Sequence, residues 1–203
     1  YIIRYMHTTG ASAFFALIYL HMFRGMMYGS YQKPRELLWV LGWITYVLLC
    51  ALGFTGYVLP WGQMSFWAAQ VILSLVGSIP FFGEELLTWI RGDYLISGIT
   101  LNRLFAFHVV LLPLALIAVV FVHILALHEV GSNNPDGVDV KKFKDDDGVP
   151  LDTKPFFPYD VMHDLYAIGV FLIFFVTIMF FYPDGGGYVI EYVNYEAADN
   201  LKT

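Results

Sequence analysis

Four histidines inside long apolar runs constrain this chain more than any other feature. They form two pairs of nearly equal spacing, with His7 and His21 fourteen residues apart and His108 and His123 fifteen apart. Fourteen helical residues turn through about 1400°, roughly 40° short of four turns, so the first pair shares one helix face. An imidazole is costly to bury without a partner, so the two runs predict two buried metal centres stacked along a helical bundle.

The second pair requires an irregular helix between its members. Fifteen residues overshoot four helical turns by about 60°. Pro113 lies between His108 and His123. Because proline lacks an N–H and can kink or locally widen a helix, the sequence predicts that the extra residue is absorbed near Pro113.

Composition places the chain in a membrane. Hydrophobic residues make up 58% and charged residues 14%, with a mean hydropathy of +0.63, whereas soluble domains carry about 25% charged residues. A membrane span needs about 20 mainly apolar residues. We therefore predict an all-α transmembrane helical bundle in which residues 1–203 form a single membrane domain. The four expected spans are Tyr1–Tyr28, Leu37–Leu59, Leu104–Leu127 and Val161–Tyr182.

The connections between these spans set the expected orientation. Residues 62–103 are still apolar and predict short helices lying in the outer interface, whereas residues 129–160 are rich in Asp, Gly and Pro and predict an inner loop. Most of the basic residues lie at the junction of the first and second spans and in the loop between the third and fourth. Because an even number of spans separates these two connections, both lie on one side, which the positive-inside rule assigns to the cytoplasm or its equivalent. These residues are Arg24, Lys33, Arg35, Lys141, Lys142, Lys144 and Lys154.

The second expected span carries an independent clue to what is bound. Gly42 and Gly56 are also fourteen residues apart and therefore share a helix face. A glycine inside a helix costs about 1 kcal/mol relative to alanine, so the pair indicates that something approaches the backbone closely. Close packing of helices through small residues is one explanation. The match to the spacing of the first histidine pair favours the other, which is a porphyrin edge against each glycine.

Two arginines supply counter-charge at matching positions. Arg4 precedes His7 by three residues and Arg24 follows His21 by three, so each can pair with the propionates of a haem held by its histidine. Snorkelling toward the membrane surface is the alternative for both. Zinc needs three or four ligands around one point, whereas each depth offers two imidazoles from facing helices. Two axial histidines suit a six-coordinate haem iron that carries electrons.

Five segments then carry specific motifs: RYMHTTGAS at Arg4–Ser12, YLHMFRGMMYGSY at Tyr19–Tyr31, GYVLPWGQMSFW at Gly56–Trp67, NRLFAFH at Asn102–His108 and HILALHEVGSNNPDG at His123–Gly137. Together they resemble cytochrome b, the di-haem subunit of the ubiquinol–cytochrome c reductase (cytochrome bc) complex of the proteobacterial and mitochondrial type. The four spans correspond to the second to fifth helices of that family. The resemblance therefore implies an interior fragment, and the family's Pro-Glu-Trp-Tyr segment is expected beyond Thr203.

The resemblance implies two b-type haems with named ligands. His7 and His108 would ligate the low-potential haem near the outer side, and His21 and His123 the high-potential haem near the inner side. The residues expected to contact the haems, from the patterns above or from the family, are Arg4, Arg24, Ser30, Trp39, Gly42, Gly56 and Asn133.

The family also has two quinone sites. The resemblance implies an outer ubiquinol site lined by Phe54, Tyr57, Trp67, Ala68, Val71 and Ile72, and an inner quinone site that includes His128, Ser132 and Asp164. Without the family, His128 reads as an interfacial polar residue and Asp164 as an acid favoured at a helix N-terminus. Ala68 stands where the family usually has glycine, which predicts weak binding of inhibitors that need the glycine's space.

The implied function is that of a respiratory quinol–cytochrome c oxidoreductase. Ubiquinol would be oxidised at the outer site and quinone reduced at the inner site, with one electron crossing the two haems and with proton translocation. The implied partners are a Rieske iron–sulfur protein, a cytochrome c-type subunit, a second cytochrome b and the lipid bilayer, in the bacterial cytoplasmic membrane or the mitochondrial inner membrane. Nothing in the sequence indicates nucleic acid binding.

Two other functional classes share the pattern of intramembrane histidines. One is the di-haem membrane anchor of a dehydrogenase, and the other is a haem-free proton or ion pathway. A count of two b-type haems per chain would exclude the second class. A co-purifying Rieske protein would separate the first class from the cytochrome bc complex.

Overall fold

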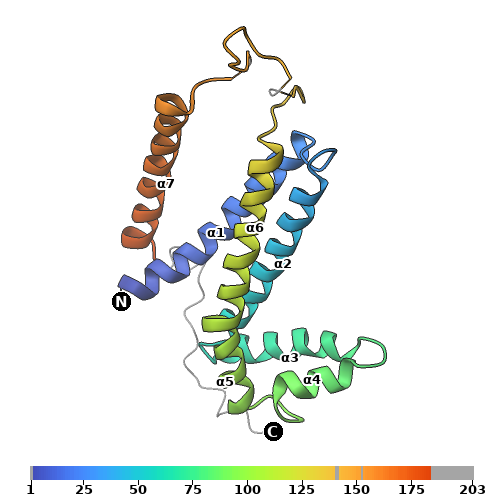
Figure 1. Cartoon of the computed structure of the whole chain (residues 1–203). Helices are drawn as coiled ribbons and strands as arrows, with labels where there is room; N and C mark the ends of the chain where they lie inside the picture. Colours follow the sequence, from blue (N-terminus) through green and yellow to red (C-terminus); the bar gives the residue numbers. More distant parts are fainter. Residues whose placement is uncertain (1, 140–141, 152, 184–203) are drawn as a thin grey trace. The chain divides into compact units, whose positions relative to one another are not determined.

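The computed structural model describes residues 2–139, 142–151 and 153–183 (Figure 1). Over these residues the chain is helical apart from turns, loops and one isolated antiparallel bridge between Lys144 and Pro150. They divide into two compact units, residues 2–39 with 126–183 and residues 40–125. The prediction of an all-α protein is confirmed for the part of the chain described here.

Three helical stretches are long and apolar enough to cross a membrane. They are Glu36–Val58, which forms helix α2, Gly98–Val130 and Phe156–Phe181, and they overlap the last three predicted spans. Helix α1, Ile2–Met27, has 26 residues but is not among them. Its length of about 39 Å would suffice, so polar side chains such as Arg4, His7 and Arg24 account for its lower hydropathy.

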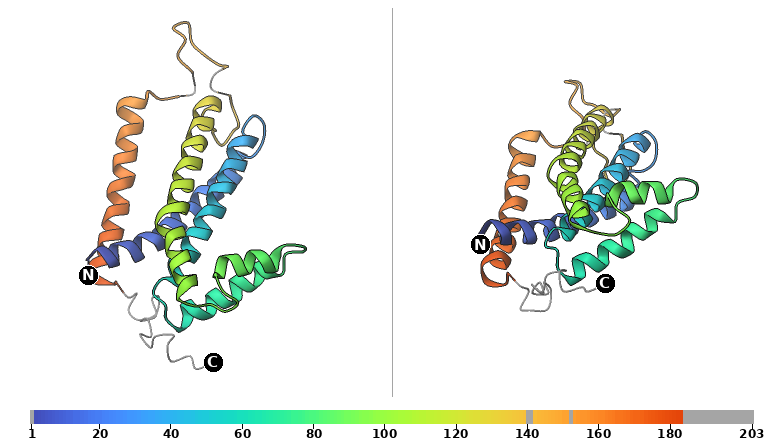
Figure 2. Two further views of the ribbon diagram at one scale, coloured as in Figure 1. Left: turned by 60° about the horizontal axis from the view of Figure 1, so that its bottom comes forward. Right: turned by 90° about the horizontal axis from the view of Figure 1, so that it is seen from below.

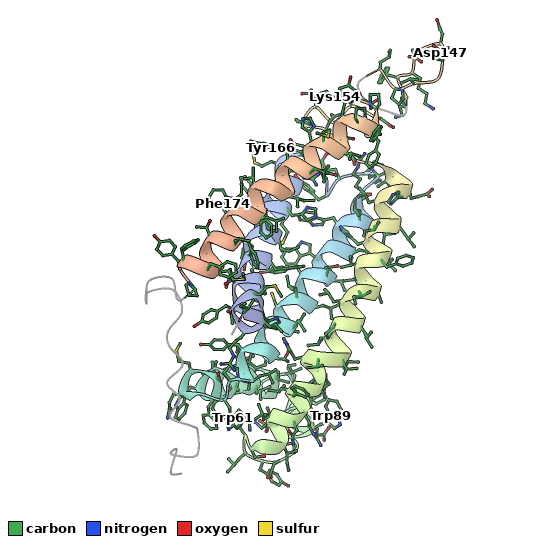
Figure 3. The ribbon with its side chains drawn as sticks, turned by 90° about the vertical axis from the view of Figure 1, so that its left-hand side faces the viewer. Trp61, Trp89, Asp147, Lys154, Tyr166 and Phe174 are labelled. Atoms are coloured by element: carbon green, nitrogen blue, oxygen red, sulfur yellow. The ribbon has the colours of Figure 1, made fainter. Side chains whose placement is uncertain are left out.

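The first unit contains α1 and α7, Val161–Phe181, which is preceded by the short π-helix η2, Phe156–Asp160. Helix α1 packs against α7, and a methyl group on Gly10 would lie 3.9 Å from Phe175. On α7, Tyr166 and Phe174 are 74% and 66% exposed and their side chains point away from the ribbon (Figure 3). This apolar outer face suits contact with lipid.

The second unit contains a pair of short helices, α3 (Gln63–Gly77) and α4 (Gly83–Arg91), which run side by side (Figure 2). The expected short helices between residues 62 and 103 are therefore present. Their turn is tight, because a methyl group on Gly83 would lie only 2.6 Å from the Gly77 carbonyl oxygen. The C-terminal end of α2, the middle of α3 and helix α5 (Gly98–Ala106) meet in a core of Val58, Ala69 and Leu104.

The third candidate span is built from three segments: α5 (Gly98–Ala106), η1 (Phe107–Leu111) and α6 (Leu112–Val130). A reciprocal pair of hydrogen bonds between Ser97 and Thr100 caps the start of α5. Segment η1 is π-helical, and the N–H of Leu112 donates to the carbonyl of Phe107, five residues back. A single π turn adds one residue to a helix. The helix irregularity predicted near Pro113, between His108 and His123, is thus present, and it lies just before the proline, at Phe107–Leu111.

Candidate functional site

His108 lies in η1 and packs directly against the backbone of α2. A methyl group on Gly56 would lie 2.9 Å from its Nδ1 atom and 3.1 Å from its Nε2 atom, closer than van der Waals contact allows. His108 Nδ1 is also 2.9 Å from the carbonyl oxygen of Leu52. Because a carbonyl oxygen only accepts hydrogen bonds, Nδ1 must carry the proton. In the neutral imidazole, the lone pair then lies on Nε2.

Thr55 completes the surroundings of this imidazole. Its side chain is buried, with an exposed fraction of 5%. Its hydroxyl donates to the carbonyls of Ala51 and Leu52 at 2.9 and 3.0 Å, and its oxygen lies 3.5 Å from His108 Nδ1. One turn of α2 thus holds the ring from its Nδ1 side, which fixes both its tautomer and its orientation.

His123 stands in the same relation to Gly42. A methyl group on Gly42 would lie 3.3 Å from His123 Cε1 and 3.8 Å from its Nδ1. The two glycines thus face the two histidines of the third candidate span within one unit. An imidazole ring approaches the backbone closely at both glycines, so the predicted porphyrin edge against each of them stays a prediction.

These surroundings fit an axial haem ligand. Histidines that bind a metal usually donate their other ring N–H to a carbonyl or carboxylate, which fixes the tautomer. The Leu52 carbonyl does this for His108, and the missing side chains of Gly42 and Gly56 leave room on α2 for the two imidazole rings. A carboxylate-rich metal site would require a different set of donors.

His7, His21 and Arg4 lie on exposed positions of α1. The structure places His7 and His21 in one unit and His108 and His123 in the other. The pairing of His7 with His108 and of His21 with His123 therefore stays a prediction. Along α1, the hydroxyl of Thr8 donates to the carbonyls of Arg4 and Tyr5, both at 3.2 Å.

The predicted inner-side residues gather in the first unit at the C-terminal end of α1. Gly25 is buried, and a methyl group on it would lie 3.2 Å from the Trp39 ring. Trp39 also contacts Tyr31, with ring centroids 6.0 Å apart. The Arg24 guanidinium lies over the Tyr28 ring, 5.8 Å from its centroid. Trp39 is thus held against the turn that follows α1.

Asn133 joins this group from the loop after α6. Its side-chain N–H donates to the Tyr28 carbonyl at 2.7 Å, and its side-chain oxygen accepts from the N–H of Asn134 at 3.0 Å. The hydroxyl of Ser30 is buried and has no hydrogen-bond partner within the described residues, while its N–H donates to the Gly25 carbonyl at 2.8 Å. Arg24, Ser30, Trp39 and Asn133 therefore belong to one local assembly, and their predicted contact with a haem stays a prediction.

The same assembly includes Ser132 through its backbone. Arg35 donates from Nε to the Gly131 carbonyl at 3.1 Å and from Nη2 to the Ser132 carbonyl at 3.2 Å. The Ser132 side chain is exposed beside these bonds. His128, in the last turn of α6, and Asp164, in the first turn of α7, are both exposed.

The predicted outer-site residues surround the junction of α2 and α3. The hydroxyl of Ser65 donates to the Tyr57 carbonyl at 2.8 Å, and Trp67 Nε1 donates to Gln63 at 3.1 Å. Trp67 and Val71 are about half exposed on successive turns of α3. Their neighbours Ala68 and Ile72 are partly exposed. Phe54 instead packs against the core of Val58, Ala69 and Leu104, so it lies on the protein side of α2.

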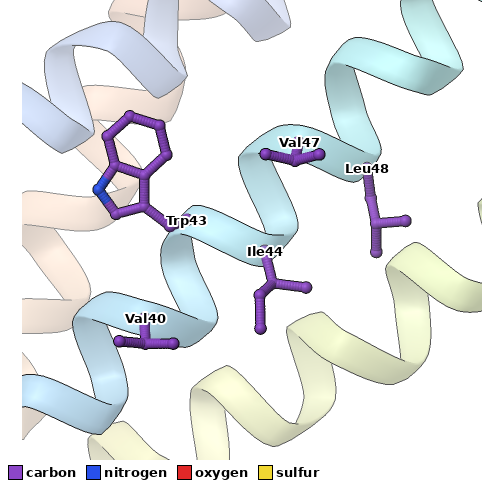
Figure 4. A pocket seen from close by; sticks show the side chains of 5 residues that line it. All are labelled: Val40, Trp43, Ile44, Val47 and Leu48. Carbon is purple, nitrogen blue, oxygen red and sulfur yellow. The ribbon is translucent and has the colours of Figure 1, made fainter. Parts of the chain in front are cut away.

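A shallow apolar groove also runs along α2. It is lined by Val40, Trp43, Ile44, Val47 and Leu48 (Figure 4). No lining side chain can titrate or bind a metal, and none belongs to the predicted sites. The groove is thus an apolar surface suited to contact with lipid and not to chemical reaction.

Three groups support these sites without having been predicted from the sequence. Thr55 and the Leu52 carbonyl hold His108, and Arg35 holds the loop of Ser132. A threonine directly before Gly56, within an apolar helix, was the available signal for the first. Arg35 is one of several basic residues in the loops, and nothing in the spacing indicates its distant partners.

Comparisons with known proteins agree with this geometry. Residues 1–131 match the family model described as cytochrome b/b6/petB. The chain is 53% identical to a cytochrome b of Allochromatium vinosum over its whole length, which is 50% of that protein. It is 47% identical to cytochromes b of Rickettsia typhi and Rhodospirillum rubrum, each covering 95% of this chain and 46% of the relative.

A solved structure gives the same result. A chain of a structure described as a hyperthermophilic respiratory Complex III superposes with a TM-score of 0.83 at 34% identity. The superposition covers 100% of this chain and 52% of that chain. The chain therefore spans about half the length of the proteins it matches.

Proposed function

The chain belongs to the cytochrome b family, and from this membership we propose that it forms part of the di-haem subunit of a respiratory quinol–cytochrome c oxidoreductase. In this proposal α1 acts as a fourth span, so that four transmembrane helices form one bundle. The observation that carries the proposal is the pair of contacts between Gly56 and His108 and between Gly42 and His123. Each contact places an imidazole ring of the third candidate span against the backbone of α2, and the two rings lie at two different depths of that span.

The four histidines would hold two b-type haems. His7 and His108 would ligate the outer haem iron, and His21 and His123 the inner one. The haem would supply one-electron transfer at each depth. The chain's own part is to fix each ring, as the Leu52 carbonyl does for His108, and to bind the propionates through charge-assisted hydrogen bonds from Arg4 and Arg24.

The remaining haem contacts belong to the inner haem. Arg24, Ser30, Trp39 and Asn133 are held together in the first unit by the contacts of Tyr28 and Gly25. The buried hydroxyl of Ser30, without a partner among the described residues, is a donor suited to a propionate oxygen. This arrangement supports the proposed assignment of these residues to the inner haem.

The two quinone sites would have different roles: the inner site would supply protons to a quinone, and the outer site would bind a quinol. Reduction of a quinone takes up two protons, which His128 and Asp164 can hold and donate near its carbonyl oxygens. Ser132 would donate a further hydrogen bond. At the outer site, the exposed apolar and aromatic side chains would bind the quinol ring and exclude water, with Phe54 acting from the core side; this set is Phe54, Tyr57, Trp67, Ala68, Val71 and Ile72.

The complete subunit would work with further proteins. We propose a Rieske iron–sulfur protein and a cytochrome c-type subunit as electron acceptors, and a second cytochrome b as partner in a homodimeric complex. The bacterial relatives favour the cytoplasmic membrane as its location. Oxidation of ubiquinol on the outer side and reduction of quinone on the inner side would translocate protons.

The pairing of ligands gives a direct test. In the complex built on the full-length protein, replacement of any one histidine by leucine should remove one haem component from a potentiometric titration. His7→Leu and His108→Leu should remove the same component, and His21→Leu and His123→Leu the other. A result in which His7→Leu and His21→Leu remove the same component would refute the proposed ligand sets. The absence of b-type haem from the wild type would refute the function itself.

A further inference from the structure

Arg35, the last residue before α2, makes two hydrogen bonds to neighbouring carbonyls far away in the sequence. Its Nε donates to Gly131 at 3.1 Å and its Nη2 to Ser132 at 3.2 Å. A guanidinium presents its donors in a rigid planar fork, which suits two acceptors at once, whereas the lysine ammonium is a point charge on a flexible stem. The identity of this residue as arginine therefore matters to the contact.

The two carbonyls lie where the chain leaves α6. Gly131 has a φ of +77°, in the left-handed region, and its N–H donates to the Leu127 carbonyl at 2.7 Å. This is the usual way for a helix to end. The direction of the next residues depends on how the chain is held after that turn, because no helix constrains them.

A second bond holds the other side of the same loop. Asn133 donates to the Tyr28 carbonyl at 2.7 Å, so the segments 28–35 and 131–134 are joined at both ends, by Arg35 and by Asn133. Ser132 lies between these two attachment points and keeps an exposed side chain. Its backbone is thus fixed while its hydroxyl is presented to the surroundings.

We infer that Arg35 is a positioning residue of the inner quinone site, which sets the place of the Ser132 hydroxyl by holding the carbonyls of Gly131 and Ser132. The inference rests on the proposed function. It assigns Arg35 no contact with quinone, since both recorded hydrogen bonds of its guanidinium go to the backbone. A positive charge at position 35 is not sufficient to hold both carbonyls, because the two hydrogen bonds come from two different nitrogens of the planar guanidinium.

The test uses the assembled complex with full-length cytochrome b and compares Arg35→Lys with Lys33→Gln. Lys33 lies two residues away on the same loop with an exposed side chain, so its replacement controls for loss of loop charge. We expect Arg35→Lys to keep both haems and quinol oxidation at the outer site. It should weaken binding of antimycin, an inhibitor of the inner site, by about tenfold or more. Lys33→Gln should bind antimycin as the wild type does.

A double-mutant cycle separates positioning from general support of the fold. If Arg35 acts through Ser132, the effect of Arg35→Lys on antimycin binding should shrink in a Ser132→Ala background, because the hydroxyl being placed is gone. Equal effects in both backgrounds would overturn the inference, as would wild-type antimycin affinity in Arg35→Lys. Loss of the inner haem in both Arg35→Lys and Arg35→Gln would show that Arg35 only supports the fold, and this result would also overturn the inference. A wild-type complex without antimycin-sensitive quinone reduction would instead refute the proposed function.

Discussion

Gly56→Ala is the substitution whose effect the structure defines most sharply. The added methyl carbon would lie 2.9 Å from His108 Nδ1 and 3.1 Å from Nε2, about 0.5–1 Å inside optimal contact. Overpacking of this kind costs about 1–3 kcal/mol. The ring cannot retreat freely, because Nδ1 is bonded to the Leu52 carbonyl. We therefore expect Gly56→Ala to weaken retention of the haem bound by His108.

Alanine substitutions at two other glycines serve as comparisons for the effect of Gly56→Ala. Gly42→Ala places its methyl group 3.3 Å from His123 Cε1, which a shift of a few tenths of an ångström relieves. Gly169→Ala, on α7, meets nothing within 4 Å and should gain about 1 kcal/mol of helix propensity. The overpacking term alone predicts that Gly56→Ala retains the His108 haem less firmly than the Gly169→Ala control by a factor of roughly 5 to 150.

The assay is a potentiometric titration of the b haems in membranes that contain the full-length complex, followed along a denaturant series. Gly56→Ala should lose the component assigned to His108 at lower denaturant, whereas Gly42→Ala should lose the component of His123 only slightly earlier than the wild type. Equal retention in Gly56→Ala and Gly169→Ala would refute the reasoning. An effect confined to Gly42→Ala would refute the assignment of rings to glycines.

Three further outcomes are expected. Deletion of Val110 should convert η1 into regular helix and leave both haems in place. Deletion of Ala16 rotates one α1 histidine by about 100° relative to the other, which places them about 140° apart around the helix and should remove a haem; loss of haem from the Val110 deletion would contradict this. Gly83→Ala, with its methyl group 2.6 Å from a backbone oxygen of Gly77, should destabilise the α3–α4 pair by about 1–3 kcal/mol, and unchanged hydrogen exchange there would contradict the tight contact. Ala68→Gly should increase the affinity of bulky outer-site inhibitors, and unchanged inhibitor binding would remove that explanation.

The regular parts of the fold were predictable because their signals are local. Apolar length and helical periodicity predicted α2, α6 and α7, and the fifteen-residue spacing around Pro113 predicted the irregular turn that η1 supplies. Matching spacings also predicted that Gly42 and Gly56 lie on one face of α2, and both meet an imidazole ring there. These inferences need only the geometry of one helix at a time.

The contacts that the sequence did not reveal are those between distant segments. Arg35 is 96 residues from Gly131, and neither residue carries a periodic signal. The hydrogen bond from His108 to Leu52 depends on how two helices face each other. Polar residues within α1 likewise lower its hydropathy without ending the helix, so that composition and length disagree about its place in the membrane.

The π-helical turn of η1 changes how its span responds to differences in chain length. In a regular α-helix, one inserted or deleted residue rotates every later side chain by about 100°. A helix that contains one wide turn can lose a residue there by becoming regular, and everything beyond keeps its direction. The segment Phe107–Leu111 therefore gives this span tolerance to the deletion of one residue between its two histidines. The regular helix α1 has no such tolerance, and its fourteen-residue interval is fixed by the fold.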